Sequence, residues 1–351
     1  MREGGGHGVP PLQKRCMDQT PKELQERLVN ILHRFADQRI VIIGDAIADR
    51  FVHGSISRVS REAPVFILKH QHTETLPGGA ANCAMNLVAL GAKVSLISVI
   101  GADEAGNELR AKLEAAGINV DGVIVSDKIE TTTKVRILAG HSHANKQQVI
   151  RIDYDGASLN DDDVRAALLN KLQQGIAAAN AFVISDYNYG VVDERAADLI
   201  RKSTSVPVLV DSRFRLPDYS GFTAATPNQE EVENLIHAPI TSTEQLEQAA
   251  TDLKQRLGHR ALLVTRGGEG MTLVESDAAP VHIRAVGAQQ PVDVTGAGDT
   301  VIATFTLALA SQASFADAAH LANYAGGLVV MKRGTATVSA EELEHAVKRA
   351  V

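Results

Sequence analysis

From Arg39 onward the chain alternates short apolar runs with helical patterns, and this alternation limits the folds open to it. The apolar runs are continuous and rich in Val and Ile, which is typical of strands covered on both faces. We predict such strands at 40–43, 94–100, 181–184, 208–210 and 261–264. Helical patterns lie between them, at 80–90, 104–116, 161–179, 193–203, 243–257 and 300–312. This order predicts an α/β fold, a doubly wound sheet with right-handed crossovers.

Two stretches, 51–75 and 118–153, break the alternation because strand-like pieces follow one another there with no helix between them. Val65–Leu68 belongs to the first, and Gly122–Ser126, Thr131–Leu138 and Gln147–Asp153 belong to the second. Strands grouped in this way predict a small antiparallel sheet projecting from the main one, as a lid, a dimer surface or both. We expect an N-terminal extension and first helix over 1–38, and one domain over 39–351 that carries both insertions.

Composition narrows the classes of function. The 351 residues include 44% hydrophobic and 22% charged residues, which are ordinary values for a globular enzyme. The net charge of −7 gives no general attraction for nucleic acid or anionic lipid, so we expect neither as a partner. No run reaches the ~18 apolar residues of a membrane span, and the N-terminus lacks the apolar core of a signal peptide. With Cys16 and Cys83 as its two cysteines, the chain is expected in the reducing cytoplasm.

Several common sites are absent from the sequence or weakly supported by it. There is no Gly-x-x-x-x-Gly-Lys-[Ser/Thr] loop, which argues against a P-loop kinase, and no Gly-x-Gly-x-x-Gly after the first strand, which weakens a dehydrogenase interpretation. His141 and His143 alternate across a polar turn with no further ligand near them in sequence. We do not expect them to bind a metal, and His70 and His72 are discounted in the same way.

The most specific motif is the turn Asp293-Val-Thr-Gly-Ala-Gly-Asp299-Thr300, which opens into an apolar run over 301–310. Gly296 and Gly298 carry no Cβ, so the backbone around Ala297 can turn sharply and approach a ligand closely. The free amides and the dipole of a following helix make this turn an anion site. A carboxylate there, Asp299, is explained if it takes a proton from a hydroxyl group that attacks a phosphate; the alternative is an ordinary N-cap.

Other polar residues follow the predicted strands, at the edge of an open α/β sheet where ligands bind. Asp45 follows the first strand and could accept hydrogen bonds from sugar hydroxyls, or could cap a turn; Asp49 is a weaker candidate. Gly78 and Gly79 precede Asn82 at a helix start, which fits either a ligand site or a packing turn. Asp186 follows the strand at 181–184.

Two further motifs fit a nucleotide site. Asn228 and Glu231 lie three residues apart at a helix start, where they could engage a magnesium–water shell near phosphates; a capping box has nearly the same spacing. Thr265, Gly267 and Gly270 belong to a glycine turn of the kind that contacts phosphate or ribose, although a plain hairpin turn remains an alternative.

Taken together, these residues resemble the ribokinase/PfkB family of carbohydrate kinases from Arg39 to the C-terminus. The resemblance rests on Gly78-Gly-Ala-Ala-Asn82, Asn228-x-x-Glu231 and Asp293–Thr300, in that order. It implies a ribokinase-like three-layer fold, a β lid over the site, ATP and Mg²⁺ as cofactors, and Asp299 as catalytic base. It also implies that the Gly296–Gly298 amides form the anion hole and that Glu231 serves the metal indirectly, through water.

Within the family, stretches such as Ser57–Val65 and Pro77–Asn82 resemble the bacterial kinases of D-glycero-D-manno-heptose 7-phosphate. This implies phosphorylation of the anomeric hydroxyl to the 1,7-bisphosphate, a precursor of ADP-heptose for the lipopolysaccharide core. From the exposed face of the lid we also expect a homodimer that pairs through the lid. Many relatives carry a C-terminal adenylyltransferase, which we expect a separate protein to supply because the chain ends at Val351.

A substrate that already bears a phosphate needs cations far from Asp299. The lid stretches offer five candidates, and Lys134 and Arg136 are favoured as a pair because they alternate onto one strand face. The others are Arg58, Arg61 and Arg151. The alternatives are another sugar kinase of the family, ribokinase- or fructokinase-like, and a catalytically silent sugar- or nucleotide-binding module. Asp211-Ser-Arg213 stands where many relatives have Asp-Pro-Lys, which leaves the role of Arg213 open.

Overall fold

The structure is a computed structural model, and it describes residues 20–140, 146–156, 159, 161–276, 278–287 and 290–349. His141, His143 and Cys16, with the extension before Thr20, lie outside these residues. The main sheet has nine strands, in the order β13 (Val281–Ile283), β12 (Met271–Glu275), β11 (Ala261–Thr265), β10 (Ala224–Ala225), β9 (Val208–Ser212), β8 (Ala181–Asp186), β1 (Arg39–Gly44), β4 (Lys93–Gly101) and β5 (Asn119–Ser126). Neighbouring strands from β5 to β11 are parallel, whereas β12 and β13 are antiparallel.

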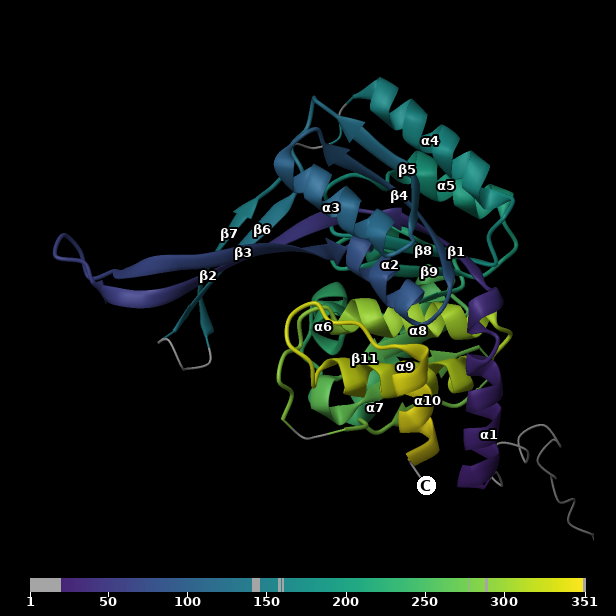
Figure 1. Ribbon diagram of the computed structural model, residues 1–351. Coiled ribbons are helices and arrows are strands. Elements are labelled where there is room, and N and C mark those ends of the chain that lie inside the picture. Colours follow the sequence, from purple (N-terminus) through teal and green to yellow (C-terminus); the bar gives the residue numbers. More distant parts are fainter. Residues whose placement is uncertain are drawn as a thin grey trace, which may run out of the picture.

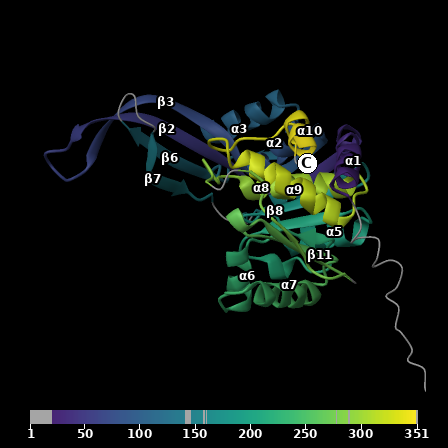
Figure 2. The same ribbon diagram turned by 90° about the horizontal axis from the view of Figure 1, so that it is seen from below.

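Helices cover both faces of this sheet (Figures 1 and 2). One buried cluster joins the sheet to α1 (Pro21–Leu32), α2 (Ala80–Ala89), α3 (Glu104–Ala115), α8 (Ala297–Ala310), α9 (Phe315–Val329) and α10 (Ala340–Arg349). A second cluster joins it to α4 (Asp162–Ile176), α5 (Glu194–Ser203), α6 (Gln229–Ile236) and α7 (Thr243–Leu257). Along β1, Ile40 and Ile42 belong to the first cluster, and Val41 and Ile43 belong to the second. The predicted three-layer α/β fold is confirmed.

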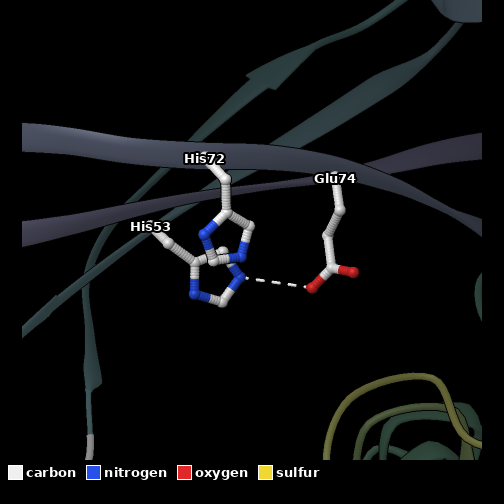
Figure 3. Close-up of side chains that lie close together, drawn as sticks. All are labelled: His53, His72 and Glu74. Atoms are coloured by element: carbon white, nitrogen blue, oxygen red, sulfur yellow. Dashed lines mark hydrogen bonds and ion pairs between the residues drawn. The ribbon is translucent and has the colours of Figure 1, made fainter.

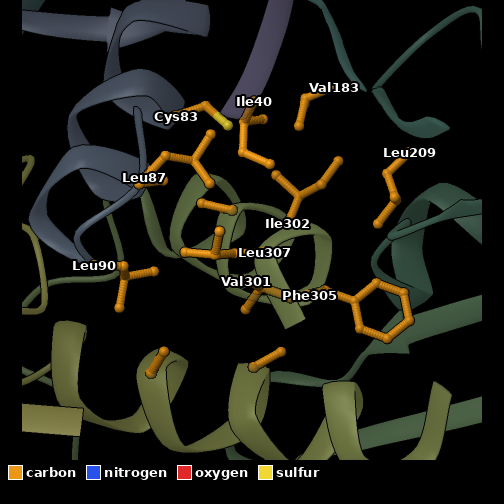
Figure 4. Close-up of a cluster of buried hydrophobic side chains, with 14 of the residues drawn as sticks. Ile40, Cys83, Leu87, Leu90, Val183, Leu209, Val301, Ile302, Phe305 and Leu307 are labelled. Atoms are coloured by element: carbon orange, nitrogen blue, oxygen red, sulfur yellow. The ribbon is translucent and has the colours of Figure 1, made fainter. Parts of the chain in front are cut away.

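Helix α8 lies in the middle of the larger cluster and is apolar on nearly all sides. Its residues pack against β8 and β9 on one side and against α2 and α9 on the others. Figure 4 shows Ile302 and Phe305 of α8 among side chains of the sheet and of α2. Because α8 is held on several sides, the turn at its N-terminus is fixed relative to the ends of the central strands.

A second sheet projects from the main body, as Figures 1 and 2 show, in the order β3 (Phe66–Gly79), β2 (Ala46–Val59), β6 (Thr133–Gly140), β7 (Gln147–Tyr154). We call these four strands the lid. The lid was expected to be antiparallel, but its central pair, β2 and β6, is parallel. The reason is that β2 and β6 come from two separate insertions, so no hairpin joins them.

One strand expected in the lid belongs elsewhere. The piece Gly122–Ser126 is part of β5, which pairs in parallel with β4 at the edge of the main sheet. That part of the prediction is wrong, because α3 supplies the crossover that a parallel neighbour needs. In the described part of the chain, no helix has the length and apolar character needed to cross a membrane.

Candidate active site

A polar cavity of about 320 Å³ lies between the lid, the ends of β8 and β9, and the N-terminus of α8. Most of the predicted site residues meet here. The predicted residues that line it are Asp49, Gly79, Lys134, Arg136, Arg151, Asp186, Asn228, Glu231, Thr265, Gly296, Ala297, Gly298 and Asp299. Residues as far apart in sequence as Asp49 and Asp299 therefore share one cavity, as expected at the carboxyl edge of such a sheet.

The turn before α8 depends on Gly296. This residue is the N-cap of α8 and adopts φ +75°, in the left-handed region that favours glycine. A Cβ at this position would lie 2.5 Å from Asn82 Nδ2, so Asn82 could not keep its place. Helix α8 begins at Ala297, three residues earlier than predicted, which puts Asp299 in its first turn. Amides in a first turn lack acceptors within the helix and favour an anion in front of them.

Asp299 is almost fully buried, and each of its carboxylate oxygens accepts a hydrogen bond. Asn82 Nδ2 donates to Oδ2 at 2.7 Å, and the Tyr187 hydroxyl donates to Oδ1 at 3.1 Å. Burial raises the pKa of Asp299 to about 6, and the two hydrogen bonds oppose that rise because they stabilise the charged form. The group is therefore ionised at neutral pH and is a better base than an exposed aspartate.

Two more carboxylates face the cavity from β9 and α6. Burial raises the pKa of Asp211 well above its usual range, and the negative charges of Asp299 and Glu231 raise it further. Burial also raises the pKa of Glu231. The backbone amide of Asn228 donates a hydrogen bond to the Glu231 carboxylate at 3.0 Å, and the backbone amide of Glu231 donates to Asn228 Oδ1 at 2.8 Å. These two bonds form a capping box at the start of α6. The spacing of this pair is thus explained by capping, and both residues also line the cavity.

The lid closes the cavity with positive charge. Arg136 forms an ion pair with Asp49, which lies diagonally across from it on the neighbouring strand β2, and both side chains are largely buried. Arg151 pairs with Asp153 at 2.8 and 2.9 Å. Lys134 lies over the ring of Tyr187, 5.4 Å from its centroid, and burial lowers the pKa of this lysine. Three cations of β6 and β7 therefore converge on the cavity that contains Asp299.

Asp45 has different partners from those expected. Its carboxylate accepts three backbone amides of the loop after β8, those of Tyr187 at 2.8 Å, Tyr189 at 3.2 Å and Val191 at 3.1 Å. Asp45 does not line the cavity, and burial raises its pKa to about 6. Its observed contacts hold the loop that carries Tyr187. A contact of Asp45 with sugar hydroxyls stays a prediction.

The two glycines before α2 bring the chain close to the site. A Cβ on Gly78 would lie 2.5 Å from Asp49 Oδ2, and a Cβ on Gly79 would lie 2.5 Å from the Asp45 carbonyl oxygen. Both positions are thus close approaches of the backbone, as the sequence predicts. The Asp186 carboxylate accepts hydrogen bonds from the Ser212 hydroxyl at 2.8 Å and from the Asn188 amide at 3.0 Å. Asp186 also lines the cavity, as predicted.

A second, more apolar cavity of about 200 Å³ adjoins the first, and the two share Thr265, Val294, Ala297 and Gly298. Gly267 and Gly270 line it, with Met271, Val301 and Val330 among the apolar residues. Gly270 adopts φ +94°, and a Cβ there would lie 2.0 Å from the Ile283 carbonyl oxygen. A flat apolar group can occupy this cavity while its polar tail reaches the N-terminus of α8.

Sequence reasoning assigned no role to two residues of the site. Tyr187 follows β8 and is the second hydrogen-bond partner of Asp299. Arg213 lines the cavity, and its charge opposes the rise in the pKa of Glu231. Tyr187 comes one position after Asp186 and Arg213 comes two positions after Asp211, both at strand ends, so extending each motif by one or two positions would have given them a place in the site.

The arrangement can transfer a phosphoryl group to a hydroxyl group. It combines a buried base with a raised pKa, helix amides aimed at an anion, carboxylates on the opposite wall and cations on the lid. The more apolar cavity beside the helix N-terminus can take the base of a nucleotide.

Comparison with known proteins agrees with this chemistry. The chain matches the pfkB family of carbohydrate kinases over residues 37–343. Two curated relatives carry the name bifunctional protein HldE. The protein from Paramagnetospirillum magneticum is 39% identical over 92% of this chain, and that from Hahella chejuensis is 40% identical over 91%. The matched region is 66% and 65% of these relatives, so the chain spans about two thirds of their length.

Solved structures show the same fold. Arabidopsis thaliana ribokinase, complexed with ribose and ATP, superimposes with a TM-score of 0.70 at 22% identity, over 89% of this chain and 99% of that one. Escherichia coli phosphofructokinase-2, in complex with substrates and products, gives 0.74 at 20% identity, over 89% and 99%. The family match includes the central strands, the lid and the turn before α8. The chain belongs to the pfkB family of carbohydrate kinases and is an ATP-dependent phosphotransferase.

Proposed function

We propose that this kinase transfers the γ-phosphoryl group of ATP to the anomeric hydroxyl of D-glycero-D-manno-heptose 7-phosphate. The product is the 1,7-bisphosphate, which enters ADP-heptose synthesis for the lipopolysaccharide core. The resemblance of the chain to heptose-phosphate kinases supports this substrate, as do the relatives named bifunctional protein HldE. The observation that carries the proposal is the group of lid cations opposite Asp299.

Lys134, Arg136 and Arg151 supply more positive charge than a neutral sugar needs. Arg136 is largely neutralised by Asp49, whereas Lys134 rests on the rings of Tyr187 and Tyr189. Burial of Lys134 costs free energy that a bound anion would offset. A phosphate on the far end of the sugar fits this position, with Asp49 left to accept sugar hydroxyls.

Asp299 is the proposed base. It accepts the proton of the anomeric hydroxyl while that oxygen bonds to the γ-phosphorus and the bond to the β–γ bridging oxygen breaks. Asn82 and Tyr187 hold the carboxylate in place, so little rearrangement is needed when the proton arrives. The amides of Gly296, Ala297 and Gly298 face the charge that builds up on the phosphoryl oxygens.

The nucleotide is proposed to lie with its base in the apolar cavity near Gly267 and Gly270, and with its phosphates before α8. Thr265 lies between the two parts because it lines both cavities. Asp211 and Glu231 fit a magnesium ion. Burial, together with the negative charges of Asp299 and Glu231, raises the pKa of Asp211, and a cation beside these carboxylates would stabilise its charged form. We assign Glu231 an indirect role through water. Bound Mg²⁺ would neutralise charge on the phosphates.

We also propose a homodimer that forms through the lid, and a cytoplasmic location. The dimer is supported by exposed apolar side chains on the lid strands, among them Phe66, Ile150, Ile152 and Tyr154. The location rests on sequence alone.

A panel of sugars and sugar phosphates, each incubated with ATP and Mg²⁺, tests the substrate directly. We expect the highest kcat/KM with D-glycero-D-manno-heptose 7-phosphate and a product phosphorylated at C1, as read by ³¹P NMR. A preference for ribose, fructose or fructose 6-phosphate would instead identify another kinase of the family. ATP-dependent turnover of no sugar at all would point to a binding module.

A further inference from the structure

Three side chains that the proposed reaction does not use gather on the lid. His53 on β2 lies directly opposite His72 on β3, and Glu74 lies two residues further along β3. One ligand atom from each lies within 4.8 Å of the others, and this is the one such group of three among the described residues. Figure 3 shows all three side chains on the same side of the two strands. We propose that they bind a divalent transition-metal ion of the zinc type.

The residue types suit such an ion. Imidazole nitrogens and a carboxylate oxygen are ligands that Zn²⁺ accepts, and three protein ligands leave a fourth position for water. The site is not visible in the sequence, because His53 and His72 are 19 residues apart and are brought together only by the pairing of β2 with β3. His72 was discounted as a ligand because its neighbours in sequence offered no partner. The partner comes instead from the opposite strand.

The distances are close to those of a coordinated ion. Two ligand atoms at about 2.0–2.1 Å from a tetrahedral Zn²⁺ lie about 3.3–3.4 Å from each other. His53 Nε2 and Glu74 Oε1 are 3.2 Å apart. The spacing of these two atoms therefore suits one shared ion, and the rings need only tilt so that the lone pair of His53 Nε2 points at the ion instead of at Oε1.

His72 must turn to complete the site. Its ring stacks on that of His53 with centroids 4.1 Å apart and planes 12° from parallel, and lone pairs in parallel planes do not point at one ion. His72 is exposed, so a rotation about χ2 meets little resistance. The ion would then replace a stacking contact with two metal–nitrogen bonds and would join β2 to β3.

The site is separate from the kinase cavity, since none of the three residues lines it. His53 lies on the same face of β2 as Asp49 because residues two and four apart share a face, and four residues span about 13 Å. Arg136, which faces Phe51 from β6, lies over the Phe51 ring and is paired with Asp49, which reduces its repulsion of a metal ion. The proposal therefore does not depend on the sugar that the kinase uses.

Titration with Zn²⁺ or Co²⁺ tests the site on full-length protein freed of metal, in excess Mg²⁺ so that the nucleotide carboxylates are occupied. We expect one Zn²⁺ ion that His72→Ala and Glu74→Gln each weaken by at least about tenfold. Co²⁺ should give visible absorption bands that these variants lose, and Zn²⁺ should raise the thermal unfolding temperature of the parent protein more than theirs.

His70→Ala is the matched control. His70 lies on the same strand and is exposed, but its Nε2 contacts Thr73 Oγ1 at 2.9 Å and it is outside the cluster. This variant should bind Zn²⁺ like the parent. Equal Zn²⁺ affinity in the parent, His72→Ala and Glu74→Gln proteins would overturn the proposal, as would a parent protein that binds no Zn²⁺ in excess Mg²⁺.

Discussion

Tyr187 and Tyr189 lie two residues apart in the loop after β8, yet their hydroxyl groups contact different carboxylates. Tyr187 donates to the base Asp299, whereas Tyr189 donates to Asp155 at 3.0 Å, at the exposed rim. The backbone amides of both residues bind Asp45, so the loop is held in the same way at both positions. This pair allows the hydroxyl of Tyr187 to be tested against a close internal control.

Replacement of Tyr187 by Phe removes a hydrogen bond that stabilises the ionised form of Asp299. The pKa of Asp299 should therefore rise further above about 6, and the acidic limb of the kcat/KM profile should move to higher pH. Tyr189→Phe should leave that limb where it is in the parent enzyme. Identical profiles for the parent and Tyr187→Phe enzymes would show that this hydrogen bond does not act on the base.

The base itself is tested by Asp299→Asn. We expect nucleotide affinity to stay within a few-fold and kcat to fall by about 10²–10⁴, because an amide cannot accept the proton. In the parent enzyme, kcat/KM should fall as the pH drops below about 6, where Asp299 becomes protonated. Asp45 also has a pKa of about 6, so the acidic limb alone does not tell which of the two carboxylates is titrating. The Tyr187 hydroxyl contacts Asp299 and not Asp45, so a shift of the limb in Tyr187→Phe would assign it to Asp299. Near-normal turnover of Asp299→Asn would contradict the assignment.

Residues of the site were predictable where the backbone itself forms the site. Gly296 and Asp299 belong to one short turn, so local sequence was enough to place them. Asp45 shows the opposite case. Its position after a strand was enough to place it at the correct edge of the sheet, but it was not enough to predict the direction of its side chain. Three amides of a loop 142 to 146 residues away in sequence determine that direction, and no local pattern reports them.

Among the elements, α8 depends most on a single backbone position. Ala at Gly296 would need φ +75° and would displace Asn82 from Asp299, at a cost of about 1–3 kcal/mol in the free energy of unfolding. Gly298 lies in the first turn of α8, and a Cβ there would meet nothing within 4 Å, so it offers a control. The thermal unfolding temperature should fall clearly for Gly296→Ala and much less for Gly298→Ala. Equal losses would mean that crowding at Gly296 is not what requires glycine.

The lid strands β6 and β7 are predicted to select a phosphorylated sugar. Lys134→Met or Arg151→Gln removes a charge-assisted contact with the distal phosphate. Such a contact contributes about 1.5–3 kcal/mol, so its loss should lower kcat/KM by about 10- to 150-fold. The loss should appear with heptose 7-phosphate and be much smaller with the unphosphorylated heptose. Arg58 and Arg61, also candidates from the sequence, are exposed and do not line the cavity. Arg58→Gln should therefore change neither value. An equal loss for both sugars would show that these cations do not bind the distal phosphate.

Helices and strands with strong periodicity were predicted well. Helix α7 begins and ends where expected, and α2, α3 and α5 differ from their predicted bounds by one residue. The strands β12 and β13 and the helices α9 and α10 were not predicted. Helix α9 is rich in Ala and Gly, which gives a weak apolar pattern; its close contacts with α8 explain why small residues are suitable there. The sequence of β5 predicts a strand, but it does not show which of the two sheets the strand joins.

At the scale of the whole molecule, the two ends of the described chain meet. Helix α1 lies beside α9 and α10 (Figure 1), where Arg27 donates to both oxygens of Asp317 at 2.9–3.0 Å and Gln25 donates to the Val347 carbonyl at 3.1 Å. Leu28 and Ile31 of α1 are buried in the larger core cluster. The first helix, expected as part of an extension over 1–38, is thus packed as part of the kinase domain.

The opposite end of the molecule presents unpaired apolar surface. Arg151 of β7 lines the active cavity, so Ile150 and Ile152, its neighbours on the strand, point to the other face of the lid. They are 52% and 40% exposed, and Tyr154 is 53% exposed on the same side. Apolar side chains at this density on one face are typical of a surface that another chain covers. A second copy of this chain is the partner that we propose.

Replacement of Ile152 by Glu would place a charge in that dimer interface, where its desolvation is costly. We expect light scattering to give twice the 37.4 kDa chain mass for the parent protein and about the chain mass for Ile152→Glu. Phe214→Glu alters a hydrophobic residue that is 64% exposed outside the lid and should leave the mass unchanged. A monomeric parent protein would contradict the dimer, and a dimeric Ile152→Glu protein would place the interface elsewhere. Because this face points away from the cavity, loss of the dimer should alter kcat/KM far less than loss of Lys134 does.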